Sequence, residues 1–139
     1  MTKARSDLWA YDSRVADKII VADDEEDIRL LCRVNLEADG FEVHEASDAD
    51  ELMLVAHRIG PIAAIVLDVT MPGRDGWQCL GELKGSPELR HIPVVMLSAH
   101  VHEGARDEAL SRGASEYVSK PFSPQRLVDV VRELIDRPR

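Results

Sequence analysis

Four short apolar runs in this chain each lead to a side chain that can take part in chemistry. The runs KIIVADD, AAIVLD, PVVMLS and EYVSKP lead to Asp23 and Asp24, Asp68, Ser98 and Lys120. If these runs are buried parallel strands, their carboxyl ends meet at one edge of a sheet, where open α/β folds bind their ligands. The pocket would then hold three carboxylates, a hydroxyl and an amine, a combination that suits a phosphoryl group and a metal ion.

Each of these side chains also has an ordinary explanation. An acidic run such as residues 23–26 is common where a helix begins, because acids offset the helix dipole. Asp68 precedes a Met-Pro-Gly segment, and aspartate is frequent before turns. Ser98 and Lys120 are unremarkable when taken alone. We favour the chemical interpretation because four of the five predicted strands end in residue types that one reaction requires.

The predicted cluster of acids favours a bound cation. Two like charges about 4 Å apart repel by roughly 4 kcal/mol at an effective dielectric near 20, so Asp23, Asp24 and Asp68 require a proton or a cation between them. Oxygen ligands select a hard ion, and Mg²⁺ fits best, with Mn²⁺ as the alternative. Lys120 and Ser98 would contact phosphoryl oxygens. Asp68 is then the predicted nucleophile, since carboxylates attack phosphorus to give acyl phosphates.

The apolar runs alternate with segments of helical periodicity, which is typical of repeated βα units. The predicted strands lie near residues 18–22, 41–46, 62–67, 92–97 and 115–119. Runs such as IAAIVL and IPVVML do not alternate with polar residues, as in strands that are covered on both faces. Right-handed crossovers then predict an α/β fold, a three-layer α/β/α sandwich around a parallel five-stranded sheet.

A helix is predicted after each strand. The second would begin near Ser47, and the last at Ser123, a good N-cap residue. Residues 75–84 and 102–112 have weaker helical periodicity, and Gly104 interrupts the latter segment. The first helix is expected to bury Ile28, Leu31, Cys32 and Leu36.

Composition limits the classes of partner and the location. The length of 139 residues suits one domain, which we place at residues 18–139 after an N-terminal extension at 1–17. A net charge of −9 disfavours direct binding to nucleic acid or to anionic membranes. No apolar stretch approaches the roughly 20 residues of a membrane span, and no secretory signal is evident, so we expect a cytoplasmic protein without membrane insertion. Cys32 and Cys79 fit reduced core residues.

Together the motifs resemble a known family. The segments IIVADDEEDIR, VLDVTMPGRDG, PVVMLSA and SEYVSKPF are similar to the receiver domain of bacterial two-component response regulators, and the resemblance covers residues 18–136. It implies a flavodoxin-like fold with strand order 2-1-3-4-5, in a stand-alone response regulator. Such a domain is a signalling switch and not an enzyme on outside substrates, because it catalyses only its own aspartyl phosphorylation and dephosphorylation.

The resemblance implies a role for each acid. Asp68 would accept a phosphoryl group from a phosphohistidine on a sensor histidine kinase or a histidine phosphotransfer protein. Asp24, Asp68 and the backbone carbonyl of Thr70 would bind Mg²⁺ directly, and Asp23 would act through water.

The resemblance also implies a switch. Lys120 would pair with the phosphoryl group, and Pro121 would follow a cis peptide bond that aims the lysine. On phosphorylation Ser98 would move toward the phosphoryl oxygens and Tyr117 would turn inward, although a tyrosine that merely packs in its strand is the alternative. The fourth helix, fifth strand and fifth helix would then control a downstream protein target or form a homodimer.

Two further positions are implicated in the lifetime of the phosphate. Thr70 and His100 stand two places after Asp68 and Ser98, where members of the family tune dephosphorylation by controlling the attacking water. His100 and His102 also form a His-x-His pair, but no further ligand is evident nearby, so solvated loop histidines are the simpler interpretation.

Three other functions remain as alternatives. A haloacid-dehalogenase-like phosphatase also uses an aspartate at a strand end, but it needs a second aspartate where this chain has Thr70. A dinucleotide-binding domain needs a Gly-rich loop after its first strand, whereas Ala-Asp-Asp-Glu-Glu would repel a pyrophosphate. A passive interaction domain of the same fold, with a vestigial pocket, is the third.

Overall fold

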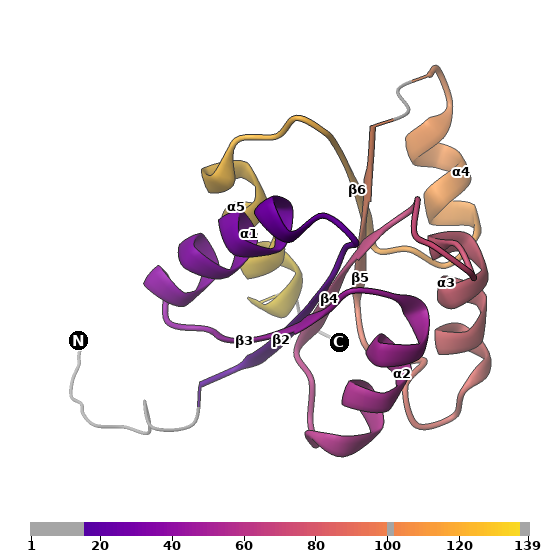
Figure 1. The fold of residues 1–139 in the computed structure, drawn as a ribbon. Coiled ribbons are helices and arrows are strands. Elements are labelled where there is room, and N and C mark those ends of the chain that lie inside the picture. The colour runs from indigo at the N-terminus through magenta and orange to yellow at the C-terminus, as the bar shows by residue number, and fades with distance from the viewer. Residues whose placement is uncertain (1–15, 100–101, 137–139) are drawn as a thin grey trace.

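The computed structural model describes residues 16–99 and 102–136, and these form one parallel sheet with helices on both faces (Figure 1). The strands are β2 (Lys18–Ala22), β3 (Glu42–Ala46), β4 (Ala64–Asp68), β5 (Val94–Ser98) and β6 (Glu116–Ser119). The helices are α1 (Glu26–Ala38), α2 (Ala49–Arg58), α3 (Gly76–Gly85), α4 (Ala105–Ser111) and α5 (Pro124–Asp136). Most of the predicted N-terminal extension lies outside the described residues.

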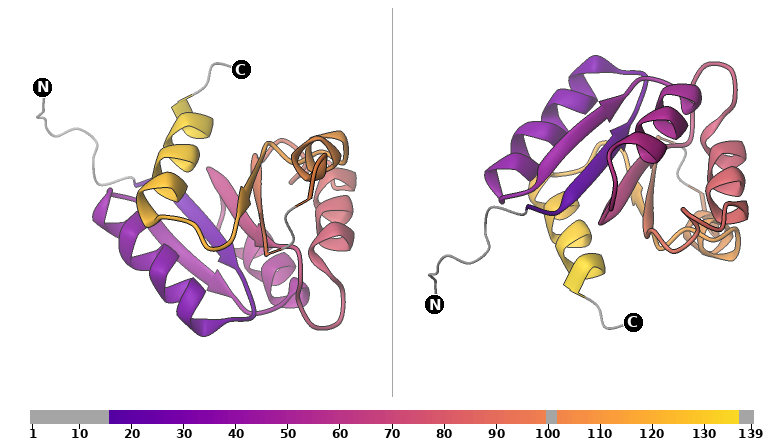
Figure 2. Two further views of the ribbon diagram at one scale, coloured as in Figure 1. Left: turned by 90° about the horizontal axis from the view of Figure 1, so that it is seen from above. Right: turned by 90° about the horizontal axis from the view of Figure 1, so that it is seen from below.

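The strand order across the sheet is β3-β2-β4-β5-β6, and all neighbouring pairs are parallel. Counted along the chain, this is the predicted order 2-1-3-4-5, so the three-layer fold is confirmed. Helices α1 and α5 cover one face of the sheet, and α2, α3 and α4 cover the other (Figures 1 and 2). The helices within the described ranges are all too short or too polar to cross a bilayer.

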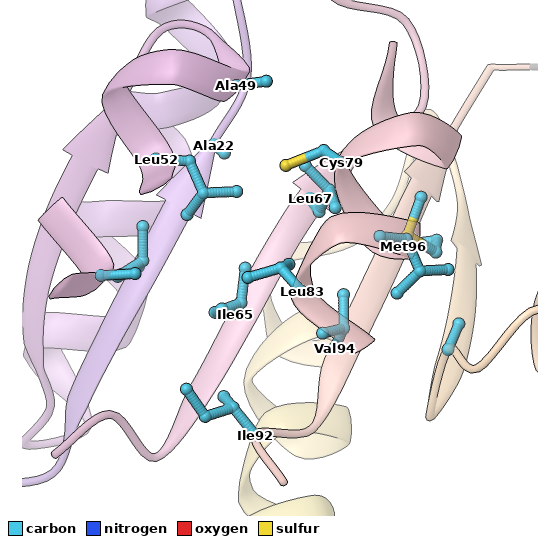
Figure 3. Packing of buried hydrophobic residues seen from close by; sticks show 14 of the residues in the cluster. Ala22, Ala49, Leu52, Ile65, Leu67, Cys79, Leu83, Ile92, Val94 and Met96 are labelled. Carbon is cyan, nitrogen blue, oxygen red and sulfur yellow. The ribbon is translucent and has the colours of Figure 1, made fainter. Parts of the chain in front are cut away.

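Two apolar cores, one on each face, hold the layers together. Figure 3 shows part of the core beneath α2 and α3, where Leu52 and Leu83 pack with Ile65 and Met96 of the sheet. The opposite core joins α1 and α5 to the other side of the same strands. Every residue of β4 and of β5 is buried. Because each fully buried aliphatic side chain contributes about 1.5–3 kcal/mol, burial of the central strands is a large contribution to the stability of the fold.

Strands β4 and β5 begin two residues later and end one residue later than predicted, so that Asp68 and Ser98 are the last residues of their strands. The chemical side chains therefore stand on the rigid sheet. A side chain on a buried strand is held more closely in place than one on a surface loop.

The prediction for Leu31 in the first helix was wrong. Cys32 and Leu36 are buried and Ile28 packs against the core, but Leu31 is 36% exposed. The side of α1 that faces the sheet carries Ile28, Cys32 and Leu36. Leu31 lies about 100° around the helix from the centre of this row. An apolar residue next to a buried row is not itself necessarily buried.

Two helix starts differ from the prediction. Helix α2 is capped by Asp48, whose side chain accepts a hydrogen bond from the backbone N–H of Glu51, and not by Ser47. Either residue type can cap a helix, and the glutamate at the third helical position is placed to close the first turn. Helix α4 starts only after Gly104, which has a φ of 86°, so the predicted helix over 102–112 was too long. A positive φ is incompatible with a right-handed helix.

Gly76 generates a prediction about how α3 meets the end of β4. A Cβ atom on Gly76 would lie 2.2 Å from the backbone oxygen of Asp68, and the Gly76 N–H donates to Val69 O at 2.7 Å. We expect Gly76→Ala to lower the free energy of unfolding by about 1–3 kcal/mol, because the backbone must shift to relieve the overlap. Urea denaturation would measure this change.

Gly81 provides the matched control in the same helix. A Cβ atom there meets nothing within 4 Å, so Gly81→Ala should stabilise the protein by about 0.5–1 kcal/mol. Equal effects of the two substitutions would show that α3 does not depend on close approach at Gly76.

Candidate functional site

The carboxyl ends of the strands bring together most of the residues that the sequence singled out. Asp23 follows β2, Asp68 ends β4, Ser98 ends β5 and Lys120 follows β6. The register pairs Asp68 with Leu97 and Ser98 with Ser119, so the three C-terminal strands end nearly level.

The carboxylates of Asp23, Asp24 and Asp68 form a group in which one oxygen from each lies within 4.8 Å of the others. Asp23 and Asp68 are buried, whereas Asp24 is exposed. Asp23 Oδ2 is buried and, among the described residues, receives no well-aligned hydrogen bond. That oxygen lies 2.9 Å from the Lys120 ammonium, but one positive charge does not balance three carboxylates, and a group of carboxylate oxygens suits a hard divalent ion. The residues present therefore fit Mg²⁺.

Asp23 is held firmly by its surroundings. The backbone N–H of Glu25 donates to Asp23 Oδ1 at 2.8 Å, and the Asp23 N–H donates to Ala46 O at 3.0 Å. Arg29 Nη1 donates to Asp23 O at 2.7 Å, while its Nε donates to Glu45 Oε1 at 3.0 Å. The sequence reasoning missed Arg29. Both Arg29 and Arg33 follow the acidic loop on α1, and the sequence does not distinguish which of them turns back to that loop.

Lys120 reaches into the group of acids from the end of β6. Its Nζ lies 2.9 Å from Asp23 Oδ2, 3.2 Å from Glu25 Oε1 and 3.3 Å from Asp68 Oδ1. Only the contact with Glu25 also has the alignment of a hydrogen bond among these three, so those with Asp23 and Asp68 are best described as ion pairs. The peptide bond between Lys120 and Pro121 is cis.

The charged groups in this pocket shift one another's pKa values. Burial raises the pKa of Asp68 from 3.8 to about 6, and the neighbouring Asp23 adds to that rise, while Lys120 and the backbone N–H of Thr70 oppose it. Burial by itself would lower the pKa of Lys120, but Asp23, Asp68 and Glu25 together raise it above its usual range. Lys120 therefore stays charged and partly offsets the acids, without cancelling them.

Ser98 and Tyr117 line the same cavity. Both are buried, and each lines a cavity of about 320 Å³ between the end of the sheet and helices α3 and α4. The cavity is lined by Val69, Trp77, Ser98, His102, Ala105, Glu108 and Tyr117. Arg112, the C-cap residue of α4, stacks over the Trp77 ring at 4.7 Å from its centroid. Trp77 was missed from the sequence, because its helix has weak periodicity.

The two residues proposed to tune the phosphate lifetime are only partly described. Thr70 is exposed and lies two residues after Asp68. His100 lies outside the described residues. His102 is exposed, with Nδ1 3.0 Å from Glu103 O, and it is not part of the carboxylate group. Cys32 and Cys79 are free and buried, as expected of core residues.

The raised pKa of Asp68 leads to a testable prediction. In the metal-free protein, the ¹³C carboxyl signal of Asp68 should titrate near pH 6. Asp23→Asn should lower this pKa, because it removes a neighbouring negative charge, and Lys120→Met should raise it. NMR titration of the three proteins measures the shifts. Titration of Asp68 near pH 4 in all three would contradict the described electrostatics.

The same shift predicts how stability and metal binding depend on pH. The folded-state pKa lies above the unfolded value, so the stability contributed by protonated Asp68 is present below about pH 3.8 and is lost as the pH rises through about 6. Binding of Mg²⁺ should weaken as the pH falls below about 6, because protons compete for Asp68. Calorimetric titration between pH 5 and pH 8 would detect the competition.

The fold and the site can be compared with known proteins. Among solved structures, the receiver domain of the Francisella response regulator 1452 matches with a TM-score of 0.81 and 30% identity, over 88% of this chain and 99% of that chain. The chemotaxis response regulator CheY4 of Vibrio cholerae matches with a TM-score of 0.80 and 25% identity, over 86% of this chain and 99% of that chain.

Sequence comparison leads to the same family. The transcriptional regulatory protein SrrA of Staphylococcus aureus is 37% identical over 123 residues, which make up 88% of this chain and 49% of SrrA. The chain thus spans about half the length of the curated relatives it matches. Residues 19–132 match the family model of the response regulator receiver domain. The chain belongs to the response regulator receiver domain family, and the resemblance noted in its sequence is confirmed.

Proposed function

We propose that this receiver domain is switched by phosphorylation of Asp68. Receiver domains of response regulators are signalling switches in two-component systems and not classical enzymes. The observation that carries the assignment of Asp68 is its contact with Lys120, whose Nζ lies 3.3 Å from Asp68 Oδ1 and 2.9 Å from the fully buried Asp23. The phosphoryl donor would be a sensor histidine kinase or a histidine phosphotransfer protein.

The acids would hold Mg²⁺, or Mn²⁺ as the alternative. Asp24 and Asp68, with the backbone carbonyl of Thr70, are the proposed direct ligands, and Asp23 would act through water. When bound, the ion offsets the negative charge of the acids and of the phosphoryl oxygens. The support for this proposal is the close group of three carboxylates, whose negative charge exceeds the single positive charge of Lys120 beside them.

In the transfer step, a carboxylate oxygen of Asp68 forms a bond to phosphorus while the bond from phosphorus to the donor histidine nitrogen breaks. The electron pair of that bond remains on the imidazole. Lys120 stabilises the negative charge on the phosphoryl oxygens, and its fixed place at the end of β6 supplies the positioning on which phosphoryl transfer depends.

Ser98 and Tyr117 would carry the signal away from Asp68. Both line the same cavity, so the ring of Tyr117 has a space of about 320 Å³ next to it. Ser98 would donate to a phosphoryl oxygen, and Tyr117 would turn into the space beside it. Because Tyr117 lies on β6, its movement would change the face formed by α4, β6 and α5, which would bind a downstream protein or a second copy of the chain.

A passive interaction domain is less well supported. Such a domain has no need to keep a lysine among three acids at the end of a sheet, because gathering like charges lowers stability. Several expectations stay predictions: a stand-alone protein, a cytoplasmic location, no contact with nucleic acid, and the roles of Thr70 and His100 in phosphate lifetime.

The assignment of the acceptor can be tested with a small phosphodonor. Acetyl phosphate with Mg²⁺ should label the protein with one phosphoryl group, detected as a mass increase in intact-protein mass spectrometry. Asp68→Asn should abolish the label, because an amide is a poor nucleophile. Asp17→Asn is a suitable control, since Asp17 is exposed at the amino end of β2. Labelling that persists in the Asp68 variant would mean that another residue is the acceptor.

The switch can be tested by fluorine NMR. The chain has two tyrosines, Tyr11 and Tyr117, so fluorotyrosine labelling combined with Tyr11→Phe yields one signal from Tyr117. Adding Mg²⁺ and beryllofluoride, which mimics an acyl phosphate, should shift that signal. Ser98→Ala should reduce the shift, because it removes the hydroxyl that would contact the phosphate. A Tyr117 signal unchanged by the mimic would support a tyrosine that merely packs.

A further inference from the structure

Three carboxylates surround the ammonium group of Lys120. It contacts Asp23, Glu25 and Asp68 at 2.9, 3.2 and 3.3 Å. Of these three contacts, only the one with Glu25 has the alignment of a hydrogen bond, whereas Asp23 and Asp68 form ion pairs with the ammonium group. For Lys120 to contact a phosphoryl oxygen on Asp68, as the proposed function requires, its ammonium group has to turn away from one of these carboxylates.

Glu25 is the contact that Lys120 is best able to release. The Glu25 side chain is 61% exposed, so water can replace the lysine at its carboxylate, whereas the Asp23 side chain is 0% exposed and that of Asp68 is 5% exposed. Leaving Asp23 unpaired would bury a bare charge, which is costly. An exposed ion pair contributes little to stability, and its loss is correspondingly easy.

Helix capping does not account for the Glu25 side chain. Glu25 occupies the N-cap position of α1, but its side chain accepts no capping hydrogen bond. The backbone N–H of Glu25, and not its carboxylate, is what holds Asp23 in place. Any residue with a backbone N–H would serve that purpose. The carboxylate therefore acts at the mouth of the pocket, where its contact is with Lys120.

We propose that Glu25 is a positioning residue that holds Lys120 in the unphosphorylated state and discriminates among phosphodonors by their charge. A phosphodonor that arrives from solution must displace the Glu25 carboxylate from Lys120, and it meets the repulsion of that carboxylate as it does so. The repulsion grows with the negative charge of the donor. Glu25 therefore slows labelling by small, multiply charged donors.

The test compares two donors and two matched variants. Acetyl phosphate is a dianion, and phosphoramidate is a zwitterion of net charge −1. In both reactions an Asp68 oxygen forms the bond to phosphorus. The bond from phosphorus to the acetyl oxygen breaks to release acetate, or the bond from phosphorus to nitrogen breaks to release ammonia.

Glu25→Gln keeps the size of the side chain and removes its charge, and Glu26→Gln makes the same change at the next, exposed residue. Labelling rates are measured by mass spectrometry at saturating Mg²⁺.

Glu25→Gln should accelerate labelling by acetyl phosphate by roughly threefold to tenfold relative to the unmodified protein, as expected for one partly exposed charge. Labelling by phosphoramidate should accelerate by only about twofold to threefold, because its net charge is half as large. Glu26→Gln should change either rate by less than about twofold. If Glu25 had a purely structural role, Glu25→Gln would change the labelling rates with both donors by the same factor.

A spectroscopic measurement tests the contact itself. The ¹³C signal of the Glu25 carboxylate should shift on Lys120→Met, and it should shift in the same direction when Mg²⁺ and beryllofluoride bind to the unmodified protein. Three results would overturn the proposal. They are slower labelling of Glu25→Gln than of the unmodified protein, equal effects of Glu25→Gln and Glu26→Gln on the rate, and equal acceleration of Glu25→Gln with both donors. A protein that neither donor labels would contradict the proposed function and this role of Glu25 with it.

Discussion

The ammonium group of Lys120 counterbalances the carboxylates that the sheet gathers at its carboxyl edge. Two buried like charges about 4 Å apart repel by roughly 4 kcal/mol at an effective dielectric near 20, which is a large fraction of the stability of a small domain. Lys120 lies within 3.3 Å of both buried acids. Burial, with a smaller contribution from Asp23, raises the pKa of Asp68 to about 6, and Lys120 opposes this rise. One ammonium group beside three carboxylates leaves a net negative charge, which suits a cation.

The apolar cores on both faces of the sheet make this concentration of charge tolerable. Strands β4 and β5 are buried along their whole length, and Asp68 and Ser98 are their last residues. Gly76 allows α3 to pack directly against the end of β4, where a methyl group would overlap the backbone of Asp68. The acceptor is thus supported from below by the sheet and from the side by a helix. Phosphoryl transfer depends on such positioning more than on any strong acid or base.

The parts of the fold that were predictable from the sequence are those that depend on local patterns. The unbroken apolar runs of β4 and β5 marked central strands, and the chemical residues at their ends marked the edge where the site lies. The errors arose where local patterns were ambiguous. Leu31 belongs to an apolar stretch, but the direction in which α1 docks leaves it on the flank. Gly104 interrupted a weak helical pattern, and its positive φ moved the start of α4.

Residue types and the alternation of strands and helices are enough to identify which chemical groups the site contains and at which strand ends they stand. Which of these groups touch depends on how the folded chain packs. Glu25 was one acid in a run of four, and nothing local distinguished it from Asp24 as the partner of Lys120. That contact joins residues 95 positions apart. It exists because the parallel sheet aligns the ends of β2 and β6, with β4 and β5 between them, and long-range packing of this kind is not encoded in any short segment.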